Sequence, residues 1–175
     1  MGVFLLIGGA RAGKSSLAAR LAHKTGLPVT FVATAEAGDE EMEQRIARHR
    51  AERPAEWTTL EEPVALAQAV DRAGADDTVI VDCLTLWVSN LILAGHDDEE
   101  VQARAEAAAA QAAGRAGRTL VVTNEVGLGV HPTSDLGRRF RDLLGRVNAI
   151  WADQAEEVIL VVAGRAMTLK PVELC

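Results

Sequence analysis

Two patterns of apolar residues alternate along this chain: short continuous runs and longer stretches with helical spacing. The apolar runs lie at 3–7, 28–34, 78–82, 119–123 and 158–162. Each is rich in valine, isoleucine or leucine, and each is short enough to be a buried β-strand. Shorter extended pieces are expected at 57–60 and 168–170.

Stretches with helical spacing separate these runs. We predict helices at 14–24, 39–53, 63–73, 84–93, 98–116 and 134–155. We expect Asp39 to cap the N-terminus of the second helix and Pro54 to end that helix. Pro63 is expected in the first turn of the third helix. Strands that alternate with helices predict an α/β fold, with a mostly parallel sheet covered by helices. We see no linker or repeat and expect one domain over residues 1–175.

Composition narrows the class of protein without changing this architecture. Apolar residues make up 49% and charged residues 25% of the 175 positions, which is ordinary for a globular domain. The net charge of −7 argues against non-specific binding of nucleic acid or of an anionic membrane. No apolar run approaches the roughly 20 residues that cross a bilayer. With two cysteines a disulfide framework is not expected, and we predict a cytoplasmic protein.

The first chemical motif follows directly on the first predicted strand. Residues 8–15 read Gly-Gly-Ala-Arg-Ala-Gly-Lys-Ser, which fits the pattern G-x-x-x-x-G-K-S. Backbone N–H groups of such a loop, together with the N-terminus of the helix that follows, bind phosphate. Lys14 is expected to reach the β- and γ-phosphates and Ser15 to hold Mg²⁺. A chance glycine-rich turn rarely has this strand before it and this helix after it, so the sequence predicts a P-loop NTPase-like domain that binds a nucleoside triphosphate.

Asp82 ends the apolar run at 78–82. Ligands of open parallel sheets bind at the carboxyl ends of the strands, so Asp82 is expected beside the phosphate loop. There it would be a second Mg²⁺ ligand together with Ser15. Aspartate is also common in turns, and the residues alone leave that alternative open.

His49 lies in an unusually charged predicted helix. At helical spacing it shares one face with Met42, Ile46 and Arg53. A lone histidine on an apolar face is more often structural. The arginines beside it would neutralise phosphates brought near, however, and a histidine that faces a triphosphate can act as a covalent nucleophile. The sequence pattern alone does not decide between a structural and a catalytic role for His49.

Further segments extend the set of motifs over the whole chain. They are Arg45-Ile46-x-x-His49, Arg53-Pro54-x-x-Trp57-x-Thr59-x-Glu61-x-Pro63, Val81-Asp82-Cys83-Leu84-Thr85-Leu86-Trp87, Thr123-Asn124-Glu125-Val126-Gly127, Arg139-x-Arg141-Asp142 and Gly145-x-x-Asn148. With the phosphate loop they resemble the bifunctional adenosylcobinamide kinase/adenosylcobinamide-phosphate guanylyltransferase family. One departure is Ala12, which stands where the family commonly has serine and leaves the backbone of the loop unchanged.

The resemblance implies two reactions and a set of site residues. The enzyme would phosphorylate adenosylcobinamide with ATP or GTP. It would then transfer GMP from GTP to that phosphate through a guanylylated histidine, giving adenosylcobinamide-GDP and pyrophosphate. The histidine would be His49, and the protein a homotrimer. The nucleotide-binding positions implied are Gly8, Gly9, Ala10, Arg11, Ala12, Gly13, Lys14, Ser15, Ala33, Thr34, Ala35, Arg50, Ala51, Glu52, Arg53, Glu61 and Asp82.

Other functions remain open at this point. A P-loop ATPase or switch module would use the same loop and Asp82, with His49 in a structural role. A small-molecule kinase would also lack the covalent histidine. Asn124 and Glu125 follow a predicted strand at the ligand edge, where they would either orient the corrinoid hydroxyl or form a turn.

Overall fold

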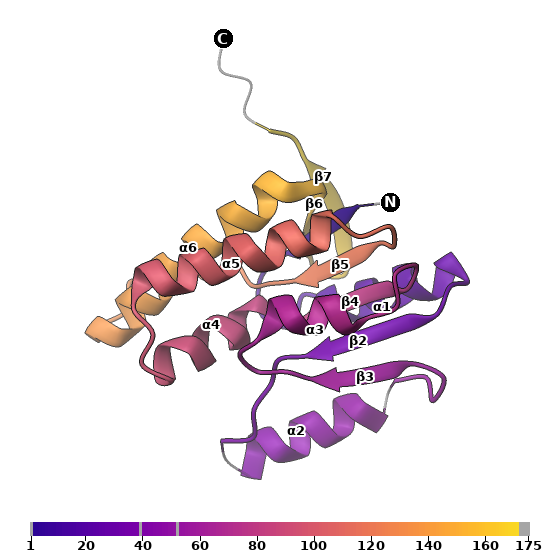
Figure 1. Cartoon of the computed structure of the whole chain (residues 1–175). Helices are drawn as coiled ribbons and strands as arrows, with labels where there is room; N and C mark the ends of the chain where they lie inside the picture. Colours follow the sequence, from indigo (N-terminus) through magenta and orange to yellow (C-terminus); the bar gives the residue numbers. More distant parts are fainter. Residues whose placement is uncertain (1, 39, 52, 172–175) are drawn as a thin grey trace.

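The computed structural model describes residues 2–38, 40–51 and 53–171. Their strands form one seven-stranded sheet in the order β3-β2-β4-β5-β1-β6-β7 (Figure 1). The strands are Val3–Ile7 (β1), Val29–Ala33 (β2), Thr58–Glu61 (β3), Thr78–Asp82 (β4), Thr119–Val122 (β5), Ala155–Val162 (β6) and Arg165–Leu169 (β7). Every neighbouring pair is parallel except β6 and β7, which form an antiparallel hairpin at one edge. The predicted mostly parallel sheet is confirmed.

Helices cover both faces of the sheet. They are Lys14–Thr25 (α1), Glu40–Ala51 (α2), Leu66–Arg72 (α3), Leu84–Leu93 (α4), Asp98–Ala113 (α5) and Asp135–Gln154 (α6). Helices α3 to α6 bury their apolar faces on one side, in a cluster with alternate strand residues such as Leu5 and Val81. Helix α1 packs on the other side, against Leu6 and Ile80. Helix α2 lies beyond the β3 edge (Figure 1).

Burial on both faces explains why the strands read as continuous apolar runs in the sequence. Successive side chains of β1 enter opposite clusters, Leu5 on the side of α3 to α6 and Leu6 on the side of α1. Strand β5 lies between β1 and β4. The loop after β1 and the residue that ends β4 therefore flank the end of β5 at one edge of the sheet.

Several element boundaries differ from the predictions: α5 ends at Ala113 rather than at 116, and β7 begins at Arg165 rather than at 168. Two further differences have local reasons. Helix α3 begins at Leu66 rather than Pro63, because the Glu62 carboxylate accepts the backbone N–H groups of Val64 and Ala65 and holds them in a turn. Strand β6 begins at Ala155, directly after α6, and continues through polar residues that its apolar run did not include. The predicted cap of α2, Asp39, lies outside the described residues.

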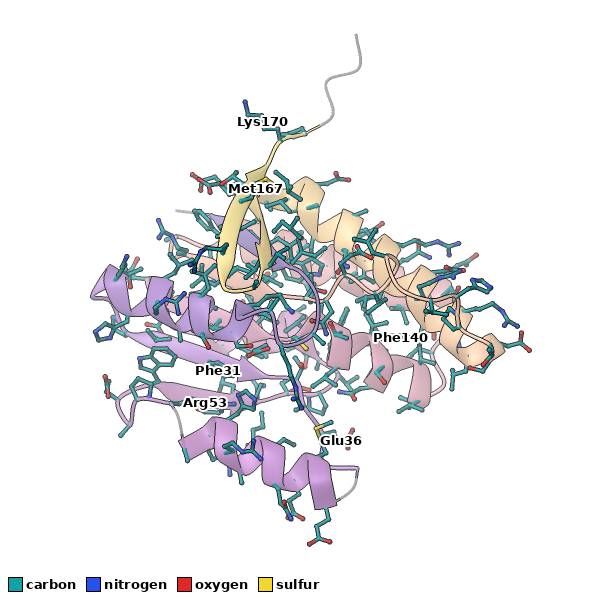
Figure 2. All side chains as sticks on the ribbon, turned by 180° about the vertical axis from the view of Figure 1, so that it is seen from behind. Phe31, Glu36, Arg53, Phe140, Met167 and Lys170 are labelled. Atoms are coloured by element: carbon teal, nitrogen blue, oxygen red, sulfur yellow. The ribbon has the colours of Figure 1, made fainter. Side chains whose placement is uncertain are left out.

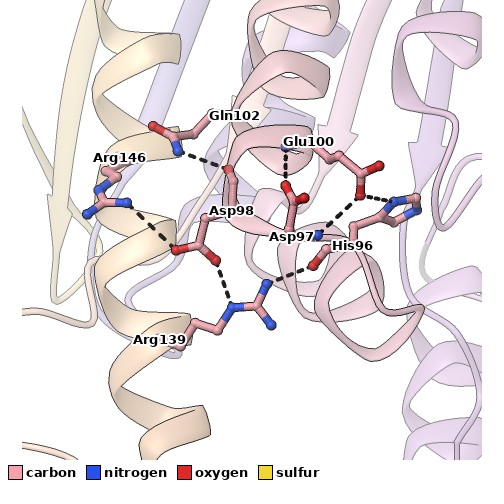
Figure 3. Close-up of polar contacts among 7 residues, drawn as sticks. All are labelled: His96, Asp97, Asp98, Glu100, Gln102, Arg139 and Arg146. Carbon is pink, nitrogen blue, oxygen red and sulfur yellow. Dashed lines mark hydrogen bonds and ion pairs between the residues drawn. The ribbon is translucent and has the colours of Figure 1, made fainter.

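The N-terminus of α5 is tied to α6 by a group of polar contacts (Figure 3). Asp97 and Glu100 form a capping box at the first turn of α5. Asp98 binds Arg139 of α6 at 2.7 Å, and Arg139 also donates to the carbonyl oxygen of His96 at 2.7 Å. Arg139, part of the matching motifs, thus has a structural contact at this helix pair. Within the described ranges no helix has the length and apolar character needed to cross a membrane.

Candidate functional site

The phosphate loop connects β1 to α1 at the carboxyl edge of the sheet. Gly8 and Gly13 have φ angles of 156° and 99°, and Arg11 between them has 57°. A Cβ atom at Gly8 would lie 2.2 Å from the carbonyl oxygen of Val161, so only glycine fits there. The Ala12 carbonyl accepts the N–H of Gly164 at 2.9 Å, which fixes the loop to the β6–β7 turn.

Lys14 folds back along this loop. Its side chain is buried, and Nζ donates to the carbonyl oxygens of Gly8 at 3.0 Å and Gly9 at 2.7 Å. Burial lowers the pKa of Lys14 below its ordinary value, while the charge of Asp82 acts in the opposite direction. The ammonium group is therefore fixed over the loop that the sequence predicts to bind phosphate.

Ser15 and Asp82 are in contact across the sheet edge. The Ser15 side chain hydrogen-bonds the Asp82 carboxylate at the end of β4. Burial raises the pKa of Asp82, and the Ser15 hydrogen bond and nearby positive charges oppose that shift. A hydroxyl and a carboxylate are the hard oxygen ligands that Mg²⁺ accepts, with phosphate oxygens and water completing its shell. No group of three or more His, Cys, Asp or Glu side chains that could hold a metal ion occurs in the described part of the chain.

The end of β2 lies in register with two acidic residues of its neighbouring strands. Ala33 pairs with Glu61 of β3 on one side and with Asp82 of β4 on the other. The next residue, Thr34, is buried, and its hydroxyl contacts both the N–H and the carbonyl of Cys83 at 2.7 Å. Ala33, a predicted nucleotide-binding position, thus lies between Glu61 and Asp82, and Thr34 follows it directly.

A cleft at this edge is lined both by His49 of α2 and by the metal-binding candidates Ser15 and Asp82. This first cleft is lined by Ser15, Phe31, Ala33, Ala35, Met42, Ile46, His49, Arg53, Glu61, Asp82, Cys83 and Leu86. Met42, Ile46 and His49 of α2 line it, as expected for residues that share a helix face. Arg53 lines it too, but from the segment after α2, which ends at Ala51, so its predicted place on the helix was wrong. A second cleft, lined by Ser15, Ser16, Ala19, Arg20, Phe31, His49, Arg53, Pro54, Trp57 and Asp82, adjoins it.

Two arginines connect α2 and the segment after it to the sheet. Arg50 forms an ion pair with Glu61 of β3. The Arg53 guanidinium lies over the Phe31 ring, 3.9 Å from its centroid, and Figure 2 shows the two side chains together. The Nε atom of Arg53 is buried and has no hydrogen-bond partner within the described residues. A buried donor in a cleft that also holds His49 is suited to an anionic ligand.

Cys83 lines the first cleft but is a poor nucleophile. Burial raises the pKa of its thiol to about 11, and the charge of Asp82 adds to the shift. Since the thiolate is the reactive form, Cys83 stays protonated near neutral pH. Of the nucleophilic side chains in the first cleft, His49 is the better suited to covalent chemistry.

The segment that follows β5 is hydrogen-bonded to the phosphate loop. Glu125 donates its backbone N–H to the carbonyl of Gly8 at 3.1 Å, and Asn124 donates its own to the Thr85 hydroxyl at 2.9 Å. The buried Asn148 accepts from the Thr123 hydroxyl at 2.7 Å and donates to the Asn124 carbonyl at 3.1 Å. The backbone groups of Asn124 and Glu125 therefore hold the turn beside the loop, and a role of their side chains toward the corrinoid hydroxyl stays a prediction.

Most predicted site residues come together, with a few exceptions. Arg11 is exposed, and Ala51 lies at the exposed end of α2 outside the lining of the clefts. Glu52 lies outside the described residues. Sequence reasoning did not assign Phe31, Leu86 or Asn90 to the site, although Phe31 lies under Arg53, Leu86 lines the first cleft and Asn90 donates to the Thr34 carbonyl at 2.8 Å. Leu86 and Asn90 belong to the stretch that resembles the family, whereas Phe31 had no signal of its own.

Comparison with known proteins identifies relatives along nearly the whole chain. The sequence profile of a family described as cobinamide kinase / cobinamide phosphate guanyltransferase matches residues 4–169. The bifunctional adenosylcobalamin biosynthesis protein CobP of Pseudomonas aeruginosa is 48% identical, over 95% of this chain and 96% of the relative. The bifunctional adenosylcobalamin biosynthesis protein CobU of Salmonella typhimurium is 36% identical, over 96% and 99%.

Solved structures with a similar fold are distant in sequence. The ATPase EscN of the enteropathogenic E. coli type III secretion system has a TM-score of 0.55 at 15% identity, over 93% of this chain and 43% of that one. The RadB recombinase has a TM-score of 0.51 at 13% identity, over 91% and 73%. At these identities the likeness shows the P-loop NTPase fold alone, which confirms the predicted fold class.

Proposed function

As a member of the cobinamide kinase / cobinamide phosphate guanyltransferase family, this chain is a bifunctional kinase and guanylyltransferase of cobalamin biosynthesis, and we propose that both reactions use the one nucleotide site described above. The substrates would be adenosylcobinamide, ATP or GTP for the first reaction, and GTP for the second. The sequence match over residues 4–169 supports the two activities. The geometry of the clefts supports the residue roles that follow.

In the kinase reaction, the phosphate loop and Lys14 would hold the triphosphate. The substrate hydroxyl oxygen attacks the γ-phosphorus, the bond from that phosphorus to the bridging oxygen breaks, and the hydroxyl proton passes to solvent. Negative charge that moves onto the leaving oxygen would be stabilised by Lys14 and by loop N–H groups. The fixed position of Lys14 Nζ over the loop supports this role, because little reorganisation would be needed.

Ser15 and Asp82 would hold Mg²⁺. When bound, the ion supplies positive charge to the phosphate oxygens. The contact between the two side chains at the phosphate loop supports the assignment. Asp82 would also keep the Ser15 hydroxyl oriented toward the site.

In the guanylyltransferase reaction, His49 would carry GMP. A ring nitrogen attacks the α-phosphorus of GTP, a P–N bond forms, and the bond to the leaving pyrophosphate breaks. The acceptor phosphate oxygen then attacks the same phosphorus, and the electron pair of the P–N bond returns to the ring. The other ring nitrogen keeps its hydrogen throughout, so the imidazole leaves neutral. Arg53, with a buried unpartnered Nε among the described residues, would bind the phosphates that pass His49.

The observation that carries this proposal is the position of His49 in the same cleft as Ser15 and Asp82. Incubation with GTP labelled at the α-phosphate tests it. Label that stays on the denatured protein in alkali and is released by acid indicates a phosphoramidate. Absence of label would favour a P-loop ATPase or kinase without a covalent histidine.

The oligomeric state and location are also part of the proposal. A homotrimer, implied by the family resemblance, would cover apolar surface on the β6–β7 hairpin at the sheet edge, where Val162, Met167 and Leu169 are 59%, 58% and 38% exposed. Exposed edge strands of this kind commonly pair with another chain or are covered by one. Light scattering coupled to gel filtration would report the mass of the assembly. A cytoplasmic location stays a prediction.

A further inference from the structure

The site does not end at the second cleft. The first and second clefts share His49, Arg53 and Asp82. A third cleft, lined by Ala19, Arg20, His23, Lys24, Pro54 and Trp57, shares Arg20, Pro54 and Trp57 with the second. The second and third clefts therefore form one groove between α1 and the segment at 54–57, which we call the α1–Trp57 groove. It opens at His49 and leads away from the first cleft.

One face of α1 forms a wall of the groove. Arg20 lies four residues after Ser16, and His23 and Lys24 lie three and four residues after Arg20, so these side chains gather on one side of the helix. Arg20 lies five residues after Ser15, about 7.5 Å further along the helix axis at the normal rise of an α-helix. A triphosphate bound at the N-terminus of α1 would not occupy Arg20, so the guanidinium group is available to a second anionic group.

The groove combines positive charge with a flat apolar surface. Arg20, His23 and Lys24 are exposed, and no ion pair engages them within the described residues. Trp57 is half-buried against the core on the α1 side, with its backbone held in a turn by the Pro54 carbonyl at 3.1 Å. Among the described residues that line the third cleft, no side chain is acidic. A ligand that is both anionic and broadly apolar would suit this surface.

We propose that the α1–Trp57 groove binds the guanylyl acceptor, phosphorylated cobinamide, with its phosphate at Arg20 and its macrocycle over Trp57 toward His23 and Lys24. This inference rests on the function proposed above, because it requires GMP on His49. With the guanosine in the first cleft, the second cleft is the open approach to the phosphorus on His49. A phosphate monoester there lies beside Arg20 and Arg53, both of which line that cleft.

The proposed binding mode fits the transfer step. An acceptor phosphate oxygen attacks the phosphorus on His49 from the side of the second cleft, the P–N bond breaks, and the new P–O–P link leaves with the acceptor. Arg20 would hold the acceptor phosphate and reduce its repulsion from the phosphate on His49. Arg20 thus acts on the second half-reaction, whereas formation of guanylyl-His49 needs no acceptor.

The test separates the two half-reactions. Pyrophosphate release from GTP without acceptor measures guanylylation, and single-turnover discharge of isolated guanylyl-enzyme measures the acceptor step. For Arg20→Ala we expect the acceptor concentration that half-saturates discharge to rise about tenfold, the usual effect of one lost charged hydrogen bond. Guanylylation should change less than about twofold, and Arg20→Lys should restore part of the loss. Arg104→Ala is the matched control, since Arg104 is an exposed cation of α5 on the opposite face of the sheet.

The outcomes are distinct. Equal losses in both half-reactions would assign Arg20 to the nucleotide and overturn the proposal, as would an unchanged discharge titration. The kinase reaction gives a further check, because unphosphorylated cobinamide has no phosphate for Arg20 to bind. If Arg20→Ala raised the KM for cobinamide in the kinase reaction as much as it raised the half-saturating acceptor concentration, the proposed phosphate contact would be contradicted. Absence of guanylylation in the unmodified enzyme would instead refute the proposed function of His49, before the groove is tested at all.

Discussion

Lys14 donates from Nζ to the carbonyl oxygen of Gly9 at 2.7 Å, so the cation of the phosphate loop is bound by the loop itself. The contact with Gly8 at 3.0 Å adds a second anchor. A long flexible side chain is thereby fixed at the place where the β- and γ-phosphates are expected. Charge that is already in position stabilises a transition state without reorganisation.

Replacement of Lys14 by alanine should therefore abolish both reactions. We expect kcat to fall by about a thousandfold or more, because charge stabilisation of the transferred phosphate is lost. Turnover of adenosylcobinamide with GTP, followed to both products, measures the effect. Circular dichroism verifies that the variant is folded. A folded variant with near-normal rates would contradict the phosphate-loop assignment.

Asp82→Asn should weaken the binding of Mg²⁺ in both reactions. The amide keeps the size of the side chain and a partner for Ser15 but removes the negative charge that attracts the cation. The Mg²⁺ concentration for half-maximal activity should rise at least about tenfold. A Mg²⁺ titration that superimposes on that of the unmodified enzyme would make Asp82 a structural turn residue.

The same substitution should stabilise the fold at neutral pH. Burial raises the pKa of Asp82, so the folded state favours the neutral carboxyl and loses stability as the pH rises through that raised value. The neutral amide avoids this loss. The melting temperature of Asp82→Asn should exceed that of the unmodified protein at pH 7.5, and the difference should shrink as the pH falls. A variant that is less stable at pH 7.5 would show that the buried charge is well compensated.

Cys83 should react slowly with thiol reagents. A rise of its pKa from 9.0 to about 11 reduces the thiolate fraction at pH 7.5 about a hundredfold. Alkylation by iodoacetamide, located by mass spectrometry and compared with a cysteine peptide, measures this difference. Cys83→Ala should also keep the GTP-derived label. Loss of label in that variant would point to the thiol instead of His49.

The sequence predicted the local parts of this site better than the contacts between distant parts. The loop at 8–15 and the strand that ends at Asp82 have strong local signals, since glycine spacing and apolar runs are readable without tertiary context. The start of α3 was misplaced because the turn depends on the Glu62 side chain rather than on Pro63. Helix propensity does not predict such a contact between the Glu62 side chain and the backbone.

Contacts between segments far apart in the chain were beyond sequence reasoning. Phe31 reads as an ordinary strand residue, and its position under Arg53 follows only from how β2 meets the end of α2. Trp57 belongs to one of the matching motifs and Arg20 to none, and neither segment indicates that the two residues meet. Only the packed fold places them along one groove that opens at His49.

The central claim is that His49 carries GMP, and labelling of the His49→Asn variant by α-labelled GTP tests it most directly. The unmodified protein should acquire label that is stable in alkali and lost in acid. The variant should remain unlabelled and make no GDP-linked product, yet still phosphorylate adenosylcobinamide to some extent, because the phosphate loop is intact. If His49→Asn is still labelled, or still forms the GDP-linked product, His49 is not the nucleophile, and His23, His96 and His131 become the candidates.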